Sequence, residues 1–273
     1  MIILKTQQEI DLMRQGGQIL ASVLFELAKA AKPGVTTKSL DELAERLIYE
    51  QGALPAFKGH QGYPAALCTS VNEEIVHALP AGRQLKEGDV LGLDLGVLFP
   101  PEQCDTCPFS EKLAPNGARC GGQKGLNTDA AVTVAVGKVS PAAERLIEVA
   151  KGALDVAVKK IKPGRKISEI SAAIQKYVEG AGFSVIRELV GHGIGYELHE
   201  DPEIPNFTGS QFKDVILKEG MTLAVEPMIS VGHWRIKKSK DKFGLETEDK
   251  SLAAHFEHTL AVTKEGCDVL TKT

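Results

Sequence analysis

Residues 1–50 carry apolar side chains at the spacing of amphipathic helices. Thr6-Gln7-Gln8-Glu9 has the pattern of a capping box and predicts the start of a helix whose apolar positions continue to Leu27. Lys32-Pro33-Gly34 predicts its end, because proline and glycine favour a turn. A second apolar face, from Thr36 to Ile48, predicts another helix. Three apolar stretches typical of buried strands then follow, at 67–71, 90–97 and 128–136.

The second half of the chain repeats this order. Helical spacing over 141–161 and 168–180 flanks a second Pro-Gly, and strand-like stretches follow at 184–187, 222–230 and 254–263. Leu85-Lys86-Glu87-Gly88 recurs as Leu217-Lys218-Glu219-Gly220, and 217 − 85 gives an offset of 132 positions. Chance repetition of a common turn is one explanation. Two related halves that face each other about a pseudo-two-fold axis are the other, and the several matching features favour it.

Each half places carboxylates within apolar, strand-like stretches. Asp94 and Glu226 each follow the leucine of the repeated tetrapeptide by nine positions, and Asp129 and Glu257 each lie in a later stretch. Burying a carboxylate is costly unless a partner or a cation neutralises it. Because these stretches contain neither lysine nor arginine, the four acids predict a metal site where the two halves meet.

The segment Gly191-His192-Gly193-Ile194-Gly195 adds an imidazole to this set. Glycines on both sides allow the backbone to approach a crowded site closely. A lone histidine is more often structural, but His192 together with the four acids is a credible ligand. This set of donors suits Mn(II), Fe(II) or Co(II) in a two-metal site better than a structural zinc site. Paired metal ions polarise carbonyl groups and activate water, which is the chemistry of amide hydrolysis.

Composition excludes several other classes of protein. The 273 residues include 32 Lys plus Arg and 36 Asp plus Glu, so the net charge of −4 argues against specific nucleic-acid binding. Five dispersed cysteines argue against a disulfide-stapled secreted scaffold. The apolar start is too short for a signal peptide, and no apolar run is long enough to span a membrane. We therefore expect a cytoplasmic globular protein with no membrane partner.

An ordered series of motifs resembles type I methionine aminopeptidases. The motifs are Asn72-Glu73-Glu74-Ile75-Val76-His77, Asp94, Asn127-Thr128-Asp129, Gly191-His192-Gly193-Ile194-Gly195, Leu198-His199-Glu200, Glu226-Pro227-Met228 and Phe256-Glu257-His258-Thr259. The resemblance covers essentially the whole chain apart from about residues 99–122. It implies the α/β (α+β) pita-bread fold, in which helices flank a curved antiparallel sheet with internal pseudo-two-fold symmetry. It also implies one catalytic domain over residues 1–273.

The resemblance implies a role for each metal-binding candidate. Asp94 would bind one of two divalent ions, and His192 and Glu226 would bind the other. Asp129 and Glu257 would bridge both ions. The ligand set accepts several metals, so manganese, iron, cobalt and zinc all remain open.

The resemblance also implies which residues act on the substrate. His77 and His199 would contact it and stabilise the tetrahedral intermediate, with core packing as the alternative. Glu226 would shuttle the proton. The methionine pocket would be formed by Tyr63, Cys68, Leu198 and Phe243, together with the two histidines.

Some pocket positions depart from the family pattern. His60 and Leu198 stand where Tyr and Phe are common, Phe243 stands in place of a Trp, and His255 stands in place of a Gln. The pocket nevertheless stays largely apolar, so an unbranched thioether still fits. We expect slightly wider tolerance at the first residue of the substrate.

Residues 99–122 form an insertion between Asp94 and Asp129, and we expect a loop at the tip of a hairpin. It is rich in proline and glycine and contains Cys104, Cys107 and Cys120. The first two cysteines have the spacing of half a zinc site, but a fourth ligand is not evident. Metal binding, a redox dithiol and a partner-contacting loop remain open.

The resemblance implies removal of the initiator methionine from nascent polypeptides, with transient ribosome association and a monomeric state. One alternative is an Xaa-Pro aminopeptidase or a prolidase-like enzyme, although such enzymes usually carry an additional N-terminal domain. A non-catalytic binding protein on the same fold is the other alternative, although such proteins typically lose ligands that this sequence retains.

Overall fold

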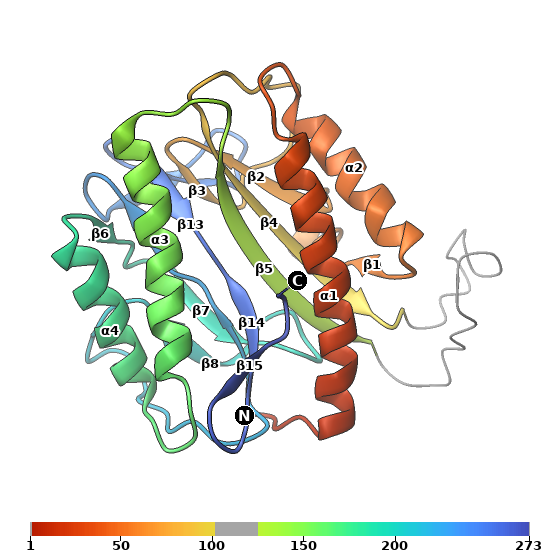
Figure 1. The fold of residues 1–273 in the computed structure, drawn as a ribbon, viewed down its shortest axis with the longest axis vertical. Helices are drawn as coiled ribbons and strands as arrows, with labels where there is room; N and C mark the ends of the chain where they lie inside the picture. The colour runs from red at the N-terminus through yellow and green to blue at the C-terminus, as the bar shows by residue number, and fades with distance from the viewer. Residues whose placement is uncertain (1, 102–124, 273) are drawn as a thin grey trace.

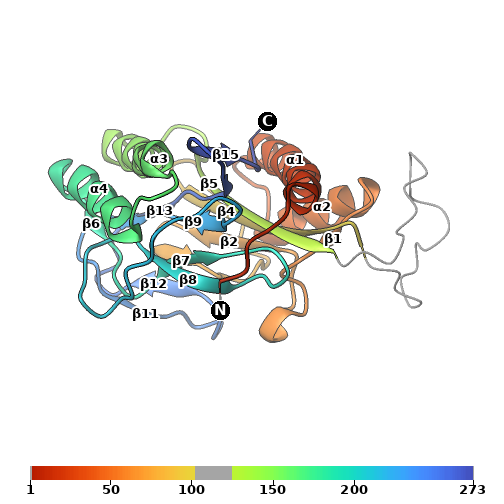
Figure 2. The ribbon, with the colours of Figure 1, turned by 90° about the horizontal axis from the view of Figure 1, so that it is seen from below.

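The computed structural model describes residues 2–101 and 125–272. Its long helices lie in one layer over curved sheets (Figures 1 and 2). They form two pairs: α1 (Gln7–Ala30) with α2 (Thr37–Glu50), and α3 (Pro141–Lys160) with α4 (Ile167–Gly180). The predicted helices are therefore confirmed. In the described part of the chain, no helix has the length and apolar character that crossing a membrane requires.

Side-chain caps fix where the first two helices begin. The Thr6 hydroxyl accepts a hydrogen bond from the backbone N–H of Glu9 at 3.3 Å, and the Glu9 carboxylate accepts one from the Thr6 N–H at 2.7 Å. This is the predicted capping box. At the start of α2, Thr36 Oγ1 accepts from the Ser39 N–H at 3.1 Å. Because each cap satisfies a free backbone donor, it stabilises its helix by about 1 kcal/mol.

The strands pair in antiparallel fashion within the described residues. One sheet has the order β1 (Leu54–Pro55), β4 (Val90–Phe99), β2 (Leu67–Val71), with β5 (Leu126–Ala135) also paired to β4. The largest has the order β15 (Cys267–Val269), β14 (His258–Val262), β9 (Thr222–Val225), β7 (Val190–Gly193), β8 (Glu200–Pro205). One of two smaller sheets has the order β13 (Ala253–His255), β10 (Met228–Ser230), β6 (Ser184–Val185). The other has the order β11 (Ile236–Lys238), β12 (Leu245–Thr247), β3 (Glu74–Val76). A short 3₁₀ turn, η1 (His60–Gly62), precedes β2.

The repeated sequence motifs make the same contacts in both halves. The Gly34 N–H donates to the Leu85 carbonyl at 2.8 Å, and the Gly164 N–H donates to the Leu217 carbonyl at 2.9 Å. Both glycines have positive φ, at 89° and 82°, where the absence of a Cβ removes the steric penalty. Each Pro-Gly turn is therefore tied to its own copy of the Leu-Lys-Glu-Gly motif, and the expected internal symmetry is confirmed.

Each half has its own apolar core under its pair of helices. Leu20, Leu27 and Leu40 belong to the core beneath α1 and α2, while Leu146 and Ile174 belong to the core beneath α3 and α4. A third cluster combines residues from both halves, including Tyr63, Cys68, Ile194, Leu198 and Ala224. This shared cluster lies where the candidate site residues converge.

Two of the predicted continuous strands are interrupted. The stretch 222–230 divides into β9 and β10, and 254–263 divides into β13 and β14, so those two predictions were wrong in extent. Pro227 has no N–H with which to continue a ladder. Glu226 and Glu257 occupy the two breaks, and Glu257 instead exchanges backbone hydrogen bonds with Ala131 of β5, at 2.9 and 3.4 Å. Because Glu226 and Glu257 lie in these breaks, the directions of their side chains do not follow the regular alternation of a strand.

The strands on either side of the insertion pair along their whole length. The β4–β5 ladder runs from Val90 opposite Ala135 to Phe99 opposite Leu126, so the flanking strands meet at one end of a hairpin. Cys104, Cys107 and Cys120 lie outside the described residues, and the alternatives for 99–122 stay predictions.

Candidate metal centre and substrate cavity

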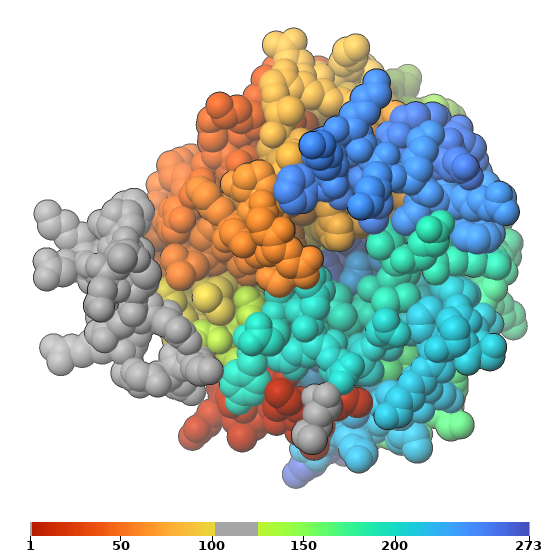
Figure 3. Space-filling view, turned by 180° about the vertical axis from the view of Figure 1, so that it is seen from behind, coloured from red at the N-terminus to blue at the C-terminus, as the bar shows by residue number. Residues whose placement is uncertain are grey.

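A cavity of about 320 Å³ opens on the face turned away from the helices. Figure 3 shows a hollow on this face, between segments coloured orange, teal and blue. Every residue predicted to bind metal or substrate lines it: Tyr63, Cys68, His77, Asp94, Asp129, His192, Leu198, His199, Glu226, Phe243 and Glu257. His60 lines it as well. Residues far apart in the sequence thus converge on one space.

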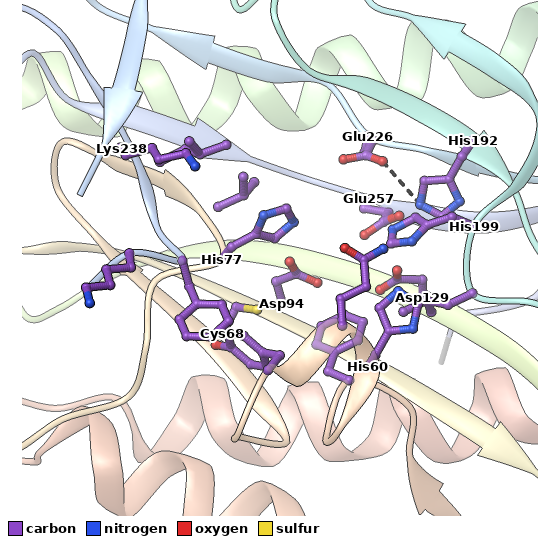
Figure 4. Close-up of a pocket in the computed structure, with 18 residues that line it drawn as sticks. His60, Cys68, His77, Asp94, Asp129, His192, His199, Glu226, Lys238 and Glu257 are labelled. Carbon is purple, nitrogen blue, oxygen red and sulfur yellow. Dashed lines mark ion pairs between the residues drawn. The ribbon is translucent and has the colours of Figure 1, made fainter. Parts of the chain in front are cut away.

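Three of the five predicted metal ligands form a tight group. One donor atom each from Asp129, His192 and Glu257 lies within 4.8 Å of the others, close enough to hold an ion. Asp94 and Glu226 lie outside this group but line the same cavity. Glu226 Oε1 is 3.5 Å from His192 Nε2, the pair marked in Figure 4.

Pairing between strands fixes the positions of the acids. Asp94 lies in the middle of β4, between Cys68 of β2 and Ala131 of β5. The Asp129 backbone is held by Thr259 of β14, whose Oγ1 accepts from the Asp129 N–H and donates to its carbonyl, both at 2.8 Å. The Thr259 hydroxyl, which belongs to the second half of the chain, therefore fixes the position of β5, the strand of the first half that carries Asp129.

The carboxyl groups of Asp94, Asp129 and Glu257 are buried, and the Glu226 side chain is 12% exposed. Burial raises the pKa of Asp94 to about 7 and raises the pKa values of Asp129, Glu226 and Glu257 well above their usual range. One oxygen each of Asp94, Asp129 and Glu257 is buried without a hydrogen-bond partner. Unsatisfied carboxylate oxygens that converge without a lysine or arginine among them fit divalent cations.

The His192 ring is oriented as a metal ligand requires. Its Nδ1 lies 2.9 Å from the Gly193 carbonyl oxygen, so Nδ1–H donates there and Nε2 keeps its lone pair toward the cavity. Burial, with a smaller effect of His199, lowers the pKa of His192 to about 3. The imidazole is therefore neutral at pH 7 and can coordinate a cation.

His77 and His199 both line the cavity, and in Figure 4 His199 lies beside Glu257 and Asp129 while His77 lies above Asp94. His77 follows β3 with φ of 60°, an uncommon backbone conformation for a residue other than glycine. Burial lowers the pKa of His77, and burial with neighbouring His60 lowers the pKa of His199 to about 4. Both rings are neutral at pH 7, so each can donate one hydrogen bond into the cavity.

The predicted methionine pocket is lined by groups that present apolar surface. The Tyr63 hydroxyl donates to the Leu67 and Ala78 carbonyls, at 3.1 and 3.2 Å as alternative acceptors, which leaves the ring to face the cavity. Phe243 contacts this ring edge-on, with centroids 5.5 Å apart. Burial raises the pKa of the Cys68 thiol, which is therefore neutral.

His255, one of the departures from the family pattern, lies behind the cavity rather than on its lining. Its Nε2 is 3.6 Å from Glu226 Oε2, and burial lowers the pKa of His255 to about 3. The Asn206 side chain donates to the Glu226 carbonyl at 2.9 Å. Glu226 thus lies between His255 and His192.

The sequence interpretation missed several residues of the lining: Phe57, Gln61, Val76, Lys238, Lys242 and Leu245. Val76 precedes His77, so its position follows from the motif. Phe57 packs against β4, where a Cβ at Gly96 would lie 2.6 Å from its ring. Only the hairpin formed by β11 and β12 brings in the lysines, and a short polar strand gives little sequence signal.

Comparison with known proteins identifies the class. The chain matches Metallopeptidase family M24 over residues 11–106 and 117–264. It is 44% identical to methionine aminopeptidase 1 of Bacillus subtilis and 43% identical to the methionine aminopeptidase of Clostridium acetobutylicum. These alignments cover 100% and 99% of both chains, respectively. The chain is thus a metallopeptidase, and within family M24 it belongs to the methionine aminopeptidases.

Solved structures agree with this assignment. The crystal structure of methionine aminopeptidase from Thermotoga maritima has a TM-score of 0.87 and 41% identity, and the match covers 100% of both chains. The prolidase from Pyrococcus horikoshii has a TM-score of 0.74 at 21% identity, and the match covers 99% of this chain but 64% of that one. The second likeness shows the shared fold alone. Together they confirm the pita-bread architecture.

Proposed function

We propose that this protein removes the N-terminal methionine from newly made polypeptides and uses two divalent metal ions to do so. The observation that carries the proposal is the convergence of five oxygen- and nitrogen-donor side chains from both halves on one cavity. The relatives named methionine aminopeptidase support the choice of substrate. Manganese, iron, cobalt and zinc are all compatible with these donors.

The five donors would share the two ions. Asp94 would hold one ion, His192 and Glu226 would hold the other, and Asp129 and Glu257 would contact both. One buried oxygen each of Asp94, Asp129 and Glu257 has no hydrogen-bond partner among the described residues, which supports the binding of cations by these acids. Ions bound there would polarise the carbonyl of the first peptide bond and make a water molecule a better nucleophile.

The chain's own residues would handle hydrogen bonds and the proton. His77 and His199, neutral at pH 7, would donate to the peptide and to the oxygen that gains negative charge. Glu226 would take the proton of the attacking water and pass it to the leaving amine. Its two oxygens lie 3.6 Å from His255 Nε2 and 3.5 Å from His192 Nε2.

Tyr63, Cys68, Leu198 and Phe243 would bind the methionine side chain. Their rings, neutral thiol and aliphatic group suit a flexible thioether. His60 and Leu198 replace larger aromatic groups, so we retain the expectation of wider tolerance at this position. Cleavage of methionine alone across a panel of first residues would contradict that expectation.

We further propose that residues 1–273 form one catalytic domain that carries the 99–122 insertion, and that the protein acts as a monomer. Its substrates would be nascent chains in the cytoplasm. Transient contact with the ribosome follows, because new N-termini emerge there.

The test is release of the first residue from Met-Ala-Ser and from an Ala-Pro peptide, with and without added metal. We expect metal-dependent release from the methionine peptide, and none from the Asp129→Asn variant. Preference for the Ala-Pro peptide would instead indicate a prolidase-like enzyme. No release from either peptide would overturn both enzymatic assignments and leave the non-catalytic alternative.

A further inference from the structure

Two lysines on the lining of the cavity have no ion-pair partner among residues 2–101 and 125–272. Lys238 ends β11, and Lys242 lies in the loop between β11 and β12. Both side chains are exposed, and no described residue forms an ion pair or a hydrogen bond with either ammonium group. In Figure 4, Lys238 lies on the same side of the carboxylates as His77, opposite His192. Two lysines that form no ion pair with any described residue therefore border the site.

Strand alternation explains why Lys238 faces the cavity and its neighbour does not. In the β11–β12 ladder, Lys237 is opposite Glu246 and Lys238 is opposite Leu245. Lys237 Nζ lies 3.9 Å from Glu246 Oε1 and donates to the Glu248 carbonyl at 3.0 Å. Lys238 and Leu245 both line the cavity. Successive side chains of a strand point to opposite faces, so the ladder fixes Lys238 on the cavity side.

The loop that carries Lys242 is held in place by hydrogen bonds to the half-buried Asp241 carboxylate. The Asp241 carboxylate accepts from the backbone N–H groups of Leu79, Phe243 and Gly244, at 2.8, 3.0 and 2.7 Å. These bonds occupy both Asp241 oxygens and tie the loop to the segment that follows His77. Asp241 therefore fixes the backbone of the loop that carries Lys242.

The size of the cavity determines which part of a peptide substrate the two lysines can contact. A space of about 320 Å³ cannot contain a polypeptide, so residues beyond the first peptide bond must cross its mouth. We propose that Lys238 and Lys242 select peptides that carry a carboxylate shortly after the bond that is cleaved. This inference rests on the proposed function. The carboxylate can be an acidic side chain or the free C-terminus of a short peptide.

The experiment compares matched peptides in the metal-loaded enzyme. Met-Ala-Ser-based peptides with an amidated C-terminus carry Asp or its neutral isostere Asn at the second, third or fourth position, and one neutral peptide is tested with a free and an amidated C-terminus. We expect kcat/KM to be about two- to fivefold higher for the charged member of the pair at one of these placements. Added salt should reduce the ratio, because exposed charges are screened.

Variants then assign the effect to these side chains. Lys238→Gln and Lys242→Gln should each lower the ratio, and the double variant should bring it to about one. Lys237→Gln, which removes the same charge from the opposite face of the same strand, should keep the wild-type ratio. Three results would overturn the inference. The kcat/KM ratio of charged to neutral peptide could equal one in the wild type, or it could stay at the wild-type value in the double variant. It could also fall as much in Lys237→Gln as in the other single variants. Absence of methionine release from every peptide would overturn the proposed function, and this inference with it.

Discussion

Replacement of Asp94 by Asn should make the metal-free protein less sensitive to pH. Burial raises the pKa of Asp94 from 3.8 to about 7 on folding, a difference equivalent to about 4 kcal/mol. An acid whose pKa rises on folding makes its full contribution to the free energy of unfolding when the pH is below the pKa of the unfolded state. That stability is lost as the pH rises from the unfolded value through the folded one. The metal-free protein should therefore be least stable above about pH 7.

The measurable part of this loss lies between pH 5 and pH 8. Linkage with the two pKa values gives about 2–3 kcal/mol over this interval from Asp94 alone. The charge on Asp94 also raises the pKa values of Asp129 and Glu226. Its removal therefore lowers those values and adds to the effect in the same direction. The side chain is fully buried, so solvent screening does not reduce it.

Urea unfolding followed by circular dichroism at pH 5 and pH 8, with a chelator present, measures this difference. Between pH 5 and pH 8, the free energy of unfolding should fall by about 2–3 kcal/mol less in Asp94→Asn than in the wild type. Asp155→Asn, on the exposed face of α3, is the control and should behave like the wild type. Equal pH dependence in wild type and Asp94→Asn would refute the reasoning that these acids are held against an electrostatic cost.

Two further substitutions test how the site is supported. Lys5 and Glu200 form an ion pair at 2.5 Å with side chains 1% and 8% exposed, so Lys5→Ala should cost about 3–5 kcal/mol in urea unfolding. Lys29→Ala, which breaks an exposed pair, should cost at most about 0.5 kcal/mol, and equal losses would contradict the argument. At Gly193 a Cβ would lie 2.1 Å from a carbonyl oxygen of β8, so Gly193→Ala should lower stability by about 1–3 kcal/mol and weaken binding in a manganese titration. Gly180→Ala, where a Cβ meets nothing within 4 Å, should leave metal binding unchanged.

The helices were predictable because their signals are local. The capping box at Thr6 and the Pro-Gly turns depend on bonds between residues close in sequence, or on the backbone freedom of one glycine. The donors of the site were also recognisable, because acids within apolar strands are costly and their repetition in both halves pointed to a shared centre. Their convergence on one cavity then followed from the fold.

Other features depend on contacts between distant segments. A continuous apolar pattern predicted single strands where the chain breaks at Glu226 and Glu257, because the pattern does not contain the bond that Glu257 forms with Ala131. The orientation of Lys238 depends on its register with Leu245, which sequence alternation in so short a strand does not fix. His255 lies beside Glu226 only because β13 pairs with β10.

The sequence by itself determined the helices, the two related halves and the chemical identity of the donors, since caps, turns and buried charges have local physical costs. Only the tertiary structure decided which donor atoms lie within 4.8 Å of one another. It also decided that His192 lines the cavity while His255 lies behind it, and that two lysines border the site. Those outcomes depend on strand pairing across more than a hundred residues. When distant strands pair, the burial and the partners of a side chain depend on the other strand. The residues next to it in the sequence do not specify that strand.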